Sequence, residues 1–166
     1  VILDTSFSMD DGGKNDFVAA RDIVSRFNRG IPTDLNYNAG LRTFGHNSHQ
    51  SEQPTALVYG MKKYTQAGFH EGLSSVRYVG GPSPIAAALD AAGNDLTSAS
   101  GKSALIVVSD GLFMDEATDA AKNFKAKMGK DFCIYTIAVG NENNGAGQDL
   151  LESVAAAGQC GFATTE

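Results

Sequence analysis

The first residues of the chain constrain its fold most, because an apolar run there ends in an acid and two alternating hydroxyls. The run Val1-Ile2-Leu3 is followed by Asp4-Thr5-Ser6-Phe7-Ser8. A short run of Val, Ile and Leu bounded by polar residues is typical of a buried parallel strand. Ligands of such sheets bind beyond the carboxyl ends of the strands, where Asp4 would lie. The stretch therefore predicts a buried strand that ends at a binding site.

The donor atoms of this turn favour a small hard cation. Asp4 offers a carboxylate, and Ser6 and Ser8 offer hydroxyls. Mg²⁺ takes oxygen ligands of this kind at about 2.0 to 2.1 Å in near-octahedral geometry. The same side chains can also do no more than close a turn, because Asp and Ser hydrogen-bond to local backbone groups. Taken alone, the turn leaves both interpretations open.

Two further stretches are expected at the same edge of the sheet. The apolar run 104–108 leads into Ser109-Asp110-Gly111, which repeats the pattern of a strand that ends at an acid. Ser83-Pro84 is typical of a helix start, with Ser83 as the cap and Pro84 in the first turn. Right-handed crossovers place the strand ends on one rim, so Asp4, Ser83 and Asp110 should converge there.

The rest of the chain alternates expected helices and strands. Helices are predicted at 16–28, 65–77, from Ser83-Pro84 onward, 115–128 and 150–157, and strands at 35–44, 55–59, 132–139 and 161–164. The polar stretch 45–54 joins two strands as a hairpin, which would form one sheet edge. The pattern predicts an α/β fold: a three-layer, doubly wound, mainly parallel sheet of about six strands with one antiparallel edge strand.

Composition limits the classes of function. The chain has 166 residues, 42% of them hydrophobic, which fits a single globular domain over 1–166. With 13 basic and 19 acidic residues the net charge is −6, which argues against a nucleic-acid partner. No apolar run is long enough for direct membrane insertion, and no targeting signal is seen. Because the chain opens directly on a strand, we expect a fragment of a longer protein.

These separated motifs carry a resemblance to a known family. Asp4-Thr5-Ser6-Phe7-Ser8 matches the Asp-x-Ser-x-Ser pattern of von Willebrand factor type A domains. Three later stretches are similar to that family's second strand, its threonine-bearing loop and its aspartate turn: 41–45, 81–85 and 109–111. The stretch 135–140 is similar to its fifth strand. The resemblance spans nearly the whole chain, with the motifs in the family's order.

The resemblance implies a metal-ion-dependent adhesion site and a non-enzymatic, cation-dependent protein-binding module. The implied metal ligands, direct or through water, are Asp4, Ser6, Ser8, Ser83 and Asp110. The implied cofactor is Mg²⁺, or Mn²⁺ or Ca²⁺, and the implied partner is a protein that supplies a carboxylate to the metal. Because the chain ends just after its last predicted strand, we expect this fragment to lack the family's final helix. A bacterial, extracytoplasmic place in the cell envelope follows only by analogy with related modules.

Two positions depart from the family pattern. Ser83 stands where the family usually has threonine, so the hydroxyl is kept but the methyl group that restrains its rotamer is lost. Phe7 replaces the small residue that is common between the two serines. We expect the first change to weaken metal binding only modestly. The second should alter the surface offered to a partner more than the coordination.

A phosphohydrolase of the haloacid dehalogenase type is the alternative function. Such enzymes also place an aspartate after their first strand and bind magnesium, so Asp4 would be the nucleophile and Ser109 a phosphate anchor. They generally carry a second aspartate, which acts as acid and base, where this chain has Ser6. The sequence therefore favours the binding module over the enzyme.

Other charged and metal-binding residue types are given smaller roles. Four acids should flank the same rim as solvated charges and favour cation capture: Asp10, Asp11, Asp115 and Glu116. His46 and His49 lie close in one loop but lack the further ligands of a zinc site. His70 is expected to be a surface or packing residue of a helix.

The two cysteines leave a choice open. Cys133 begins one predicted strand and Cys160 precedes the next, so the residues would lie on neighbouring strands. They can form a disulfide or remain two buried thiols. A disulfide would imply an extracytoplasmic location.

Overall fold

A six-stranded sheet organises the chain. The computed structural model describes residues 1–10, 15–77, 79–97, 99, 101–113, 116–129, 131–140 and 145–165. The strands are β1 (Ile2–Asp4), β2 (Asn38–Phe44), β3 (Thr55–Lys63), β4 (Ser103–Ser109), β5 (Phe132–Ala138) and β6 (Ala163–Thr165). Their spatial order is β3-β2-β1-β4-β5-β6, and only the β2–β3 pairing is antiparallel. The predicted α/β architecture with an antiparallel edge strand is confirmed.

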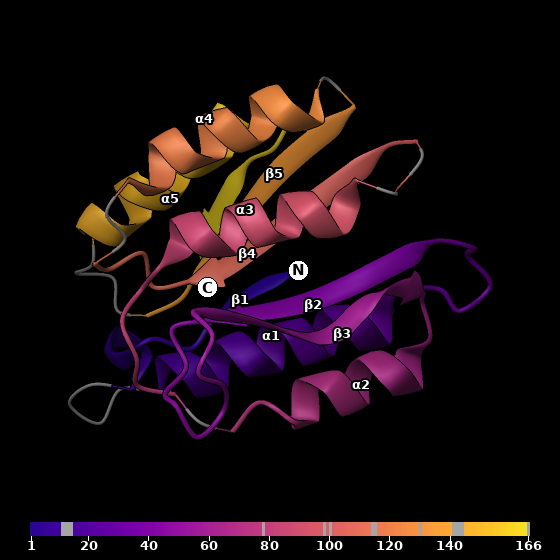
Figure 1. The fold of residues 1–166 in the computed structure, drawn as a ribbon, viewed down its shortest axis with the longest axis horizontal. Helices are drawn as coiled ribbons and strands as arrows, with labels where there is room; N and C mark the ends of the chain where they lie inside the picture. Colours follow the sequence, from indigo (N-terminus) through magenta and orange to yellow (C-terminus); the bar gives the residue numbers. More distant parts are fainter. Residues whose placement is uncertain are drawn as a thin grey trace.

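Helices cover both faces of this sheet (Figure 1). They are α1 (Asp16–Gly30), α2 (Gln66–Ser74), α3 (Ile85–Leu96), α4 (Ala117–Met128) and α5 (Gly145–Ala157). Figure 1 shows α1 and α2 on one side and α3, α4 and α5 on the other. None of the described helices combines the length and the apolarity that crossing a membrane requires.

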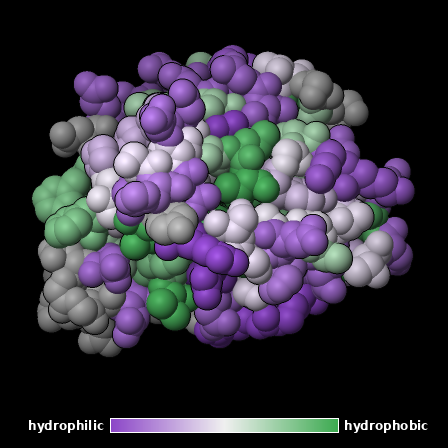
Figure 2. Space-filling view, turned by 60° about the horizontal axis from the view of Figure 1, so that its bottom comes forward, coloured by the Kyte–Doolittle hydropathy of each residue, from purple (hydrophilic) through white to green (hydrophobic). Residues whose placement is uncertain are grey.

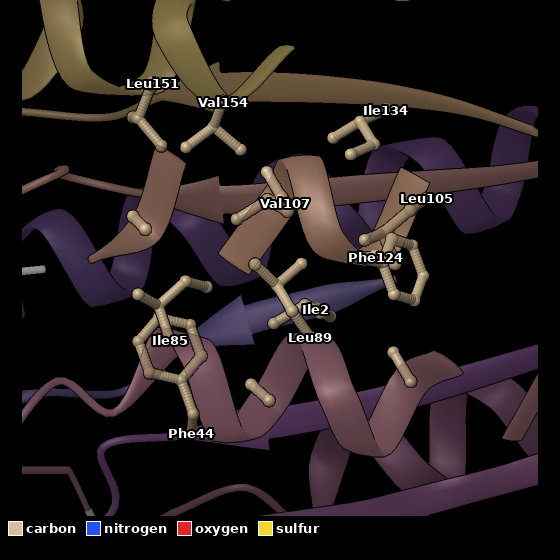
Figure 3. Close-up of a cluster of buried hydrophobic side chains, with 14 of the residues drawn as sticks. Ile2, Phe44, Ile85, Leu89, Leu105, Val107, Phe124, Ile134, Leu151 and Val154 are labelled. Carbon is tan, nitrogen blue, oxygen red and sulfur yellow. The ribbon is translucent and has the colours of Figure 1, made fainter. Parts of the chain in front are cut away.

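The main core lies between the sheet and the three-helix face. Side chains along β5 alternate between buried and half-buried, as expected for a strand whose two faces are covered unequally. Its buried side chains, which include Ile134, pack with residues of α3, α4 and α5 such as Leu89, Phe124 and Leu151 (Figure 3). The face of α1 and α2 holds a second cluster around Leu3 and Met9. β1 is therefore buried on both faces, which explains its uninterrupted apolar run.

Several predicted boundaries and one core assignment need correction. The helix predicted at 65–77 ends at Ser74, β3 continues to Lys63, and the last helix begins at Gly145. Ser83 does not cap α3, because Pro84 occupies the N-cap position and no side-chain hydrogen bond caps that end. The helical spacing of α1 places Phe27 on the same stripe as the buried Ala20 and Val24 and so predicts a core residue, yet Phe27 is 42% exposed. Tertiary packing sets these details, and local propensity does not encode it.

The Cys133–Cys160 disulfide is formed, which resolves the choice left open by the sequence. The cysteines are separated by 27 residues. The parallel β5–β6 ladder pairs Thr136 with Ala163 and Ala138 with Thr165, which is the same offset. The bridge therefore continues the strand register toward the beginning of both strands and ties the short edge strand β6 to the sheet.

Candidate functional site

The ends of β1 and β4 meet at the predicted rim of the sheet. The two strands are parallel neighbours, with Ile2 paired to Val107 and Leu3 to Val108, so the next residues are Asp4 and Ser109. The Ser109 hydroxyl donates to Asp4 Oδ2 at 2.5 Å, and both side chains are fully buried. A residue of one strand end thus holds the carboxylate of the other.

The turn after β1 brings its hydroxyls together. The Ser6 N–H donates to Asp4 Oδ1 at 2.8 Å, and the Ser6 and Ser8 hydroxyl oxygens are 3.1 Å apart. A short 3₁₀ turn, η1 (Phe7–Met9), produces this spacing, because Met9 is drawn into the core at 0% exposure. The Asp-x-Ser-x-Ser pattern therefore places one carboxylate and two hydroxyls in a single buried turn.

The loop before α3 is bound to this turn by backbone hydrogen bonds. The Phe7 N–H donates to the Gly81 carbonyl at 2.8 Å, and the Gly80 N–H donates to the Thr5 carbonyl at 2.9 Å. Ser83, two residues beyond Gly81, is half-buried, and its hydroxyl has no hydrogen-bond partner among the described residues. The structure thus brings the Ser83 loop to the β1 turn and gives the Ser83 hydroxyl no hydrogen-bond partner within the described part of the chain.

A glycine makes this close approach of loops possible. Gly45 has φ +76°, and a Cβ atom there would lie 2.7 Å from Ser6 Cα and 2.8 Å from the Pro82 carbonyl oxygen. Any side chain at Gly45 would push the Ser6 turn away from the loop that carries Ser83. The end of β2 therefore shapes the site without contributing a donor atom.

The turn after β4 carries the second carboxylate. Asp110 is 1% exposed, and its Oδ1 accepts the Leu112 N–H at 3.0 Å. The Ser109 hydroxyl accepts the Gly111 N–H at 2.9 Å while it donates to Asp4. Gly111 has φ +74°, and a Cβ atom there would lie 2.3 Å from the Gly147 carbonyl oxygen. This turn is thus packed tightly against the start of α5.

Two buried carboxylates in one small region create an electrostatic cost. The pKa of Asp4 is raised to about 7, mainly by burial and to a smaller extent by the negative charge of Asp110. Hydrogen bonds from Ser109 and Ser6 oppose this shift but do not cancel it. No Lys or Arg in the described part of the chain pairs with Asp4. A bound cation would supply the missing positive charge.

The residues at this rim fit a hard divalent cation. The hydroxyls of Ser6, Ser8 and Ser83 and the carboxylates of Asp4 and Asp110 are all oxygen donors, the type that Mg²⁺ and Ca²⁺ select. The described residues contain no cluster of three or more His, Cys, Asp and Glu side chains that could hold a metal. The proposed donor set contains only two such side chains, Asp4 and Asp110. Its other three donors are serine hydroxyls.

Of the flanking acids and the histidines, those in the described part of the chain are exposed or hydrogen-bonded away from this donor set. Asp10 and Glu116 are exposed, and Asp11 and Asp115 lie outside the described residues. His46 is buried, and its ring nitrogens hydrogen-bond to Thr43 Oγ1 and the Gln53 carbonyl, which fixes the β2–β3 loop. His49 and His70 are exposed. The described residues thus give His46 a structural role.

Sequence reasoning missed two residues of this rim. The sequence suggests a role for Ser109 only as a phosphate anchor of the alternative enzyme, yet its hydroxyl hydrogen-bonds to both Asp4 and the Gly111 N–H. The order Ser-Asp-Gly after an apolar strand is the sequence signal that could have indicated a role for Ser109. Phe113 was not singled out, although it is 77% exposed and lies three residues after Asp110. A large apolar residue directly after such a turn could have drawn attention to it.

The fold and the order of these motifs define a class of protein, namely α/β domains with a polar site at the carboxyl rim of a mostly parallel sheet. The family model of the von Willebrand factor type A domain matches residues 1–112, and the chain belongs to that family. A search of curated proteins finds no match.

Solved structures with the same fold span nearly the whole chain. A serine-substituted form of an aerotolerance-related membrane protein from Bacteroides fragilis aligns with a TM-score of 0.69 and 17% identity over 99% of this chain and 88% of that one. Manganese-loaded TRAP from Plasmodium vivax gives 0.70 and 14% over 99% and 66%. The pilus adhesin SpaC of Lactobacillus rhamnosus GG, in an open conformation, gives 0.73 and 13% over 99% and 27%. At these identities the likeness concerns the fold.

Proposed function

We propose that the rim binds a divalent cation and forms a metal-ion-dependent adhesion site. The ligands, direct or through water, would be Ser6, Ser8, Ser83, Asp4 and Asp110. The cation would be Mg²⁺, with Mn²⁺ or Ca²⁺ as substitutes. The observation that carries this proposal is the buried Asp4 carboxylate, which has no Lys or Arg partner among the described residues and adjoins two hydroxyls 3.1 Å apart.

The serine and aspartate side chains would contribute to cation binding in different ways. The serine hydroxyls are neutral donors, so they reduce the charge of a bound cation less than carboxylates would. Asp4 and Asp110 would provide the negative charge that retains the ion. When bound, the cation would supply an electrophilic point at the rim that attracts an anionic group of a partner. Ser109 would act by holding Asp4 in position, because it donates to Asp4 Oδ2.

The function that follows is non-enzymatic binding of a protein whose carboxylate completes the coordination. Membership of the von Willebrand factor type A family supports this proposal, and so does the fold shared with a pilus adhesin and with a manganese-loaded protein. The net charge of −6 speaks against a nucleic-acid partner. We further propose that residues 1–166 act as one domain, without inserting into a membrane.

An extracytoplasmic location is part of the same proposal. The Cys133–Cys160 disulfide supports it, because disulfides persist in oxidising compartments. The shared fold with a bacterial membrane protein and a pilus adhesin agrees with a place in a bacterial cell envelope.

Calorimetry with Mg²⁺ and Mn²⁺ tests this function. The wild-type protein should bind one divalent ion, and the Asp4→Ala variant should show no measurable binding. Phe162→Ala, a change at an exposed residue just before β6, is the control and should bind as the wild type does. A generic phosphate ester is assayed in parallel. Turnover that Asp4→Ala abolishes would support the phosphohydrolase instead, and an absence of metal binding by the wild type would refute the proposed site.

A further inference from the structure

Two exposed phenylalanines follow the two strand ends that carry the proposed metal site. Phe7 is 59% exposed although every other residue from Ile2 to Met9 is buried. Phe113, at 77%, is the most exposed large hydrophobic residue in the described part of the chain. Figure 2 shows that apolar, green atoms are exposed in several places on this face of the molecule, among hydrophilic ones. Apolar side chains gathered at one rim are typical of an interaction surface.

The same hydrogen bonds that hold the proposed ligands position these two rings. The Phe7 N–H donates to the Gly81 carbonyl at 2.8 Å, which fixes the backbone between Ser6 and Ser8. Phe113 follows the turn in which Asp110 Oδ1 accepts the Leu112 N–H. Because β1 and β4 are neighbours and Asp4 is bonded to Ser109, the two phenylalanines follow adjacent strand ends. Both would contact a ligand that reaches the metal.

The backbone at Phe113 adds a second observation. Its φ of +54° lies in the left-handed region, which a bulky residue without special reason avoids. Strained conformations of this kind cluster at binding sites, where the surrounding structure enforces them. The ring of this strained residue is exposed to solvent, so it is not stabilised by burial in the core. A contact outside the described chain would explain why the ring is kept there.

The charges of the rim limit what this surface can accept. The three turns 4–10, 79–84 and 109–113 contain no Lys or Arg, and of the described charges close to them in sequence Asp10 and Glu116 are exposed acids and Arg77 is an exposed base. Within these three turns, a partner carboxylate could therefore be attracted only by the cation. The exposed acids would repel further acids of the partner, while apolar side chains of the partner could pack against the two phenylalanines.

We propose that the partner segment carries a single acidic residue with apolar side chains on both sides. The acid would reach the cation, and the apolar side chains would pack on Phe7 and Phe113. This inference rests on the proposed metal site and specifies the partner of that site. A basic segment, drawn to Asp10 and Glu116 without any metal, is the competing ligand that the test must separate.

Three sets of capped synthetic peptides serve as probes, each with one central Asp. The residues on both sides of the Asp are Leu in the first set, Ser in the second and Lys in the third. Binding of labelled peptides is measured by fluorescence polarisation with saturating Mn²⁺ and again with EDTA. The Leu-flanked peptides should bind at least about tenfold more tightly than the Ser-flanked ones. EDTA should abolish that binding.

Matched variants connect the effect to the two rings. Phe7→Ala and Phe113→Asn should each weaken the Leu-flanked peptides about tenfold, and Asn is chosen because it tolerates a positive φ. Both variants should keep the wild-type affinity for Mn²⁺ within about twofold by calorimetry, because neither change removes a proposed ligand. Phe162→Ala is the control: that residue is 65% exposed but packs against Tyr135 on the β5–β6 edge.

The outcomes separate this inference from the proposed function. If the wild type binds Mn²⁺ but does not distinguish Leu from Ser flanks, the inference is wrong and the metal site stands. Preference for Lys flanks, or binding that persists in EDTA, also overturns the inference. Loss of Mn²⁺ binding in Phe7→Ala or Phe113→Asn would contradict the proposed separation of ring and metal roles. If the wild type binds no metal at all, the proposed function itself fails.

Discussion

The ends of β1 and β4 share the same local sequence pattern, but the carboxylates of Asp4 and Asp110 accept different hydrogen bonds. Each strand is apolar, reaches a buried aspartate and is followed within four residues by an exposed phenylalanine. Asp4 has both carboxylate oxygens engaged, by the Ser6 N–H and the Ser109 hydroxyl. Asp110 Oδ1 accepts a hydrogen bond from the Leu112 N–H, within its own turn.

The difference indicates that the two ends have unequal roles. The bonds of Asp4 reach a proposed ligand, Ser6, on one side and the β4 turn on the other, so this carboxylate joins the two ends. Ser109 is shared in the same way, because it donates to Asp4 and accepts from Gly111. In the proposed site, the β1 end would therefore supply the centre and the β4 end the second charge.

The largest expected effect is the contrast between Asp4→Asn and Asp110→Asn. Asp4→Asn removes a charge and disturbs the bonds that position Ser6 and Ser109, so Mg²⁺ affinity should fall at least about 100-fold. Asp110→Asn also removes a charge but leaves in place the Asp4 carboxylate that joins the two strand ends, so affinity should fall about tenfold. Calorimetry on both purified variants measures the contrast.

The opposite ranking would reverse the assignment of the two ends. Equal losses would mean that only total charge matters and that the hydrogen-bond difference has no consequence for metal binding. Far-ultraviolet circular dichroism of both variants is the control for folding. Both changes preserve side-chain shape, so we expect the wild-type spectrum.

A smaller effect concerns pH and the β1 end alone. The pKa of Asp4 is raised from 3.8 to about 7 in the folded protein, and burial is the main cause. Between about pH 4 and pH 7 the unfolded state has released this proton while the folded state keeps it, so metal-free stability should fall as pH rises. Asp4→Asn should remove this decline, which thermal denaturation in EDTA measures.

Metal binding should show the opposite trend with pH. The cation needs the deprotonated carboxylate, so Mg²⁺ affinity should be roughly 30-fold weaker at about pH 5.5 than at about pH 8. Mg²⁺ should accordingly raise the melting temperature more at the higher pH. Mg²⁺ binding that is independent of pH over this range would show that Asp4 does not take part.

The smallest expected effect concerns the third loop, which lies outside both strand ends. Ser83→Thr should tighten Mg²⁺ binding by about two- to threefold, because the added methyl group restricts the rotamer of the hydroxyl. Ser83→Ala should weaken binding by about tenfold through loss of one donor. If both variants bind as the wild type does, Ser83 is not a ligand, and the site consists of the two strand ends alone.

The sequence predicted the architecture because its strongest signals are local. The apolar runs at β1 and β4 and the helical spacing of the stretches between strands are enough to define a mainly parallel sheet with its edge hairpin. The convergence of Asp4, Ser6, Ser8 and Asp110 followed from the strand ends, because parallel neighbours finish on one rim. The metal itself remains a prediction.

Other features depend on packing between segments far apart in the chain. The bond between Ser109 and Asp4 joins residues separated by 105 positions, and no periodicity reveals it. The exposure of Phe27 and Phe113 and the failure of Ser83 to cap α3 likewise depend on which surfaces other elements cover. The cysteine register needed the strand pairing, which fixes the offset of 27 residues.

The most direct test of the account is the location of the ion itself. A crystal of the protein grown with Mn²⁺ should give one anomalous-scattering peak at the rim, within about 2.5 Å of the Ser6 and Ser8 hydroxyl oxygens. The same peak should lie close to Ser83, Asp4 and Asp110, with direct bonds or single bridging waters. A fully occupied peak elsewhere, or an empty rim at saturating Mn²⁺, would contradict the claim that the joined ends of β1 and β4 form a metal site.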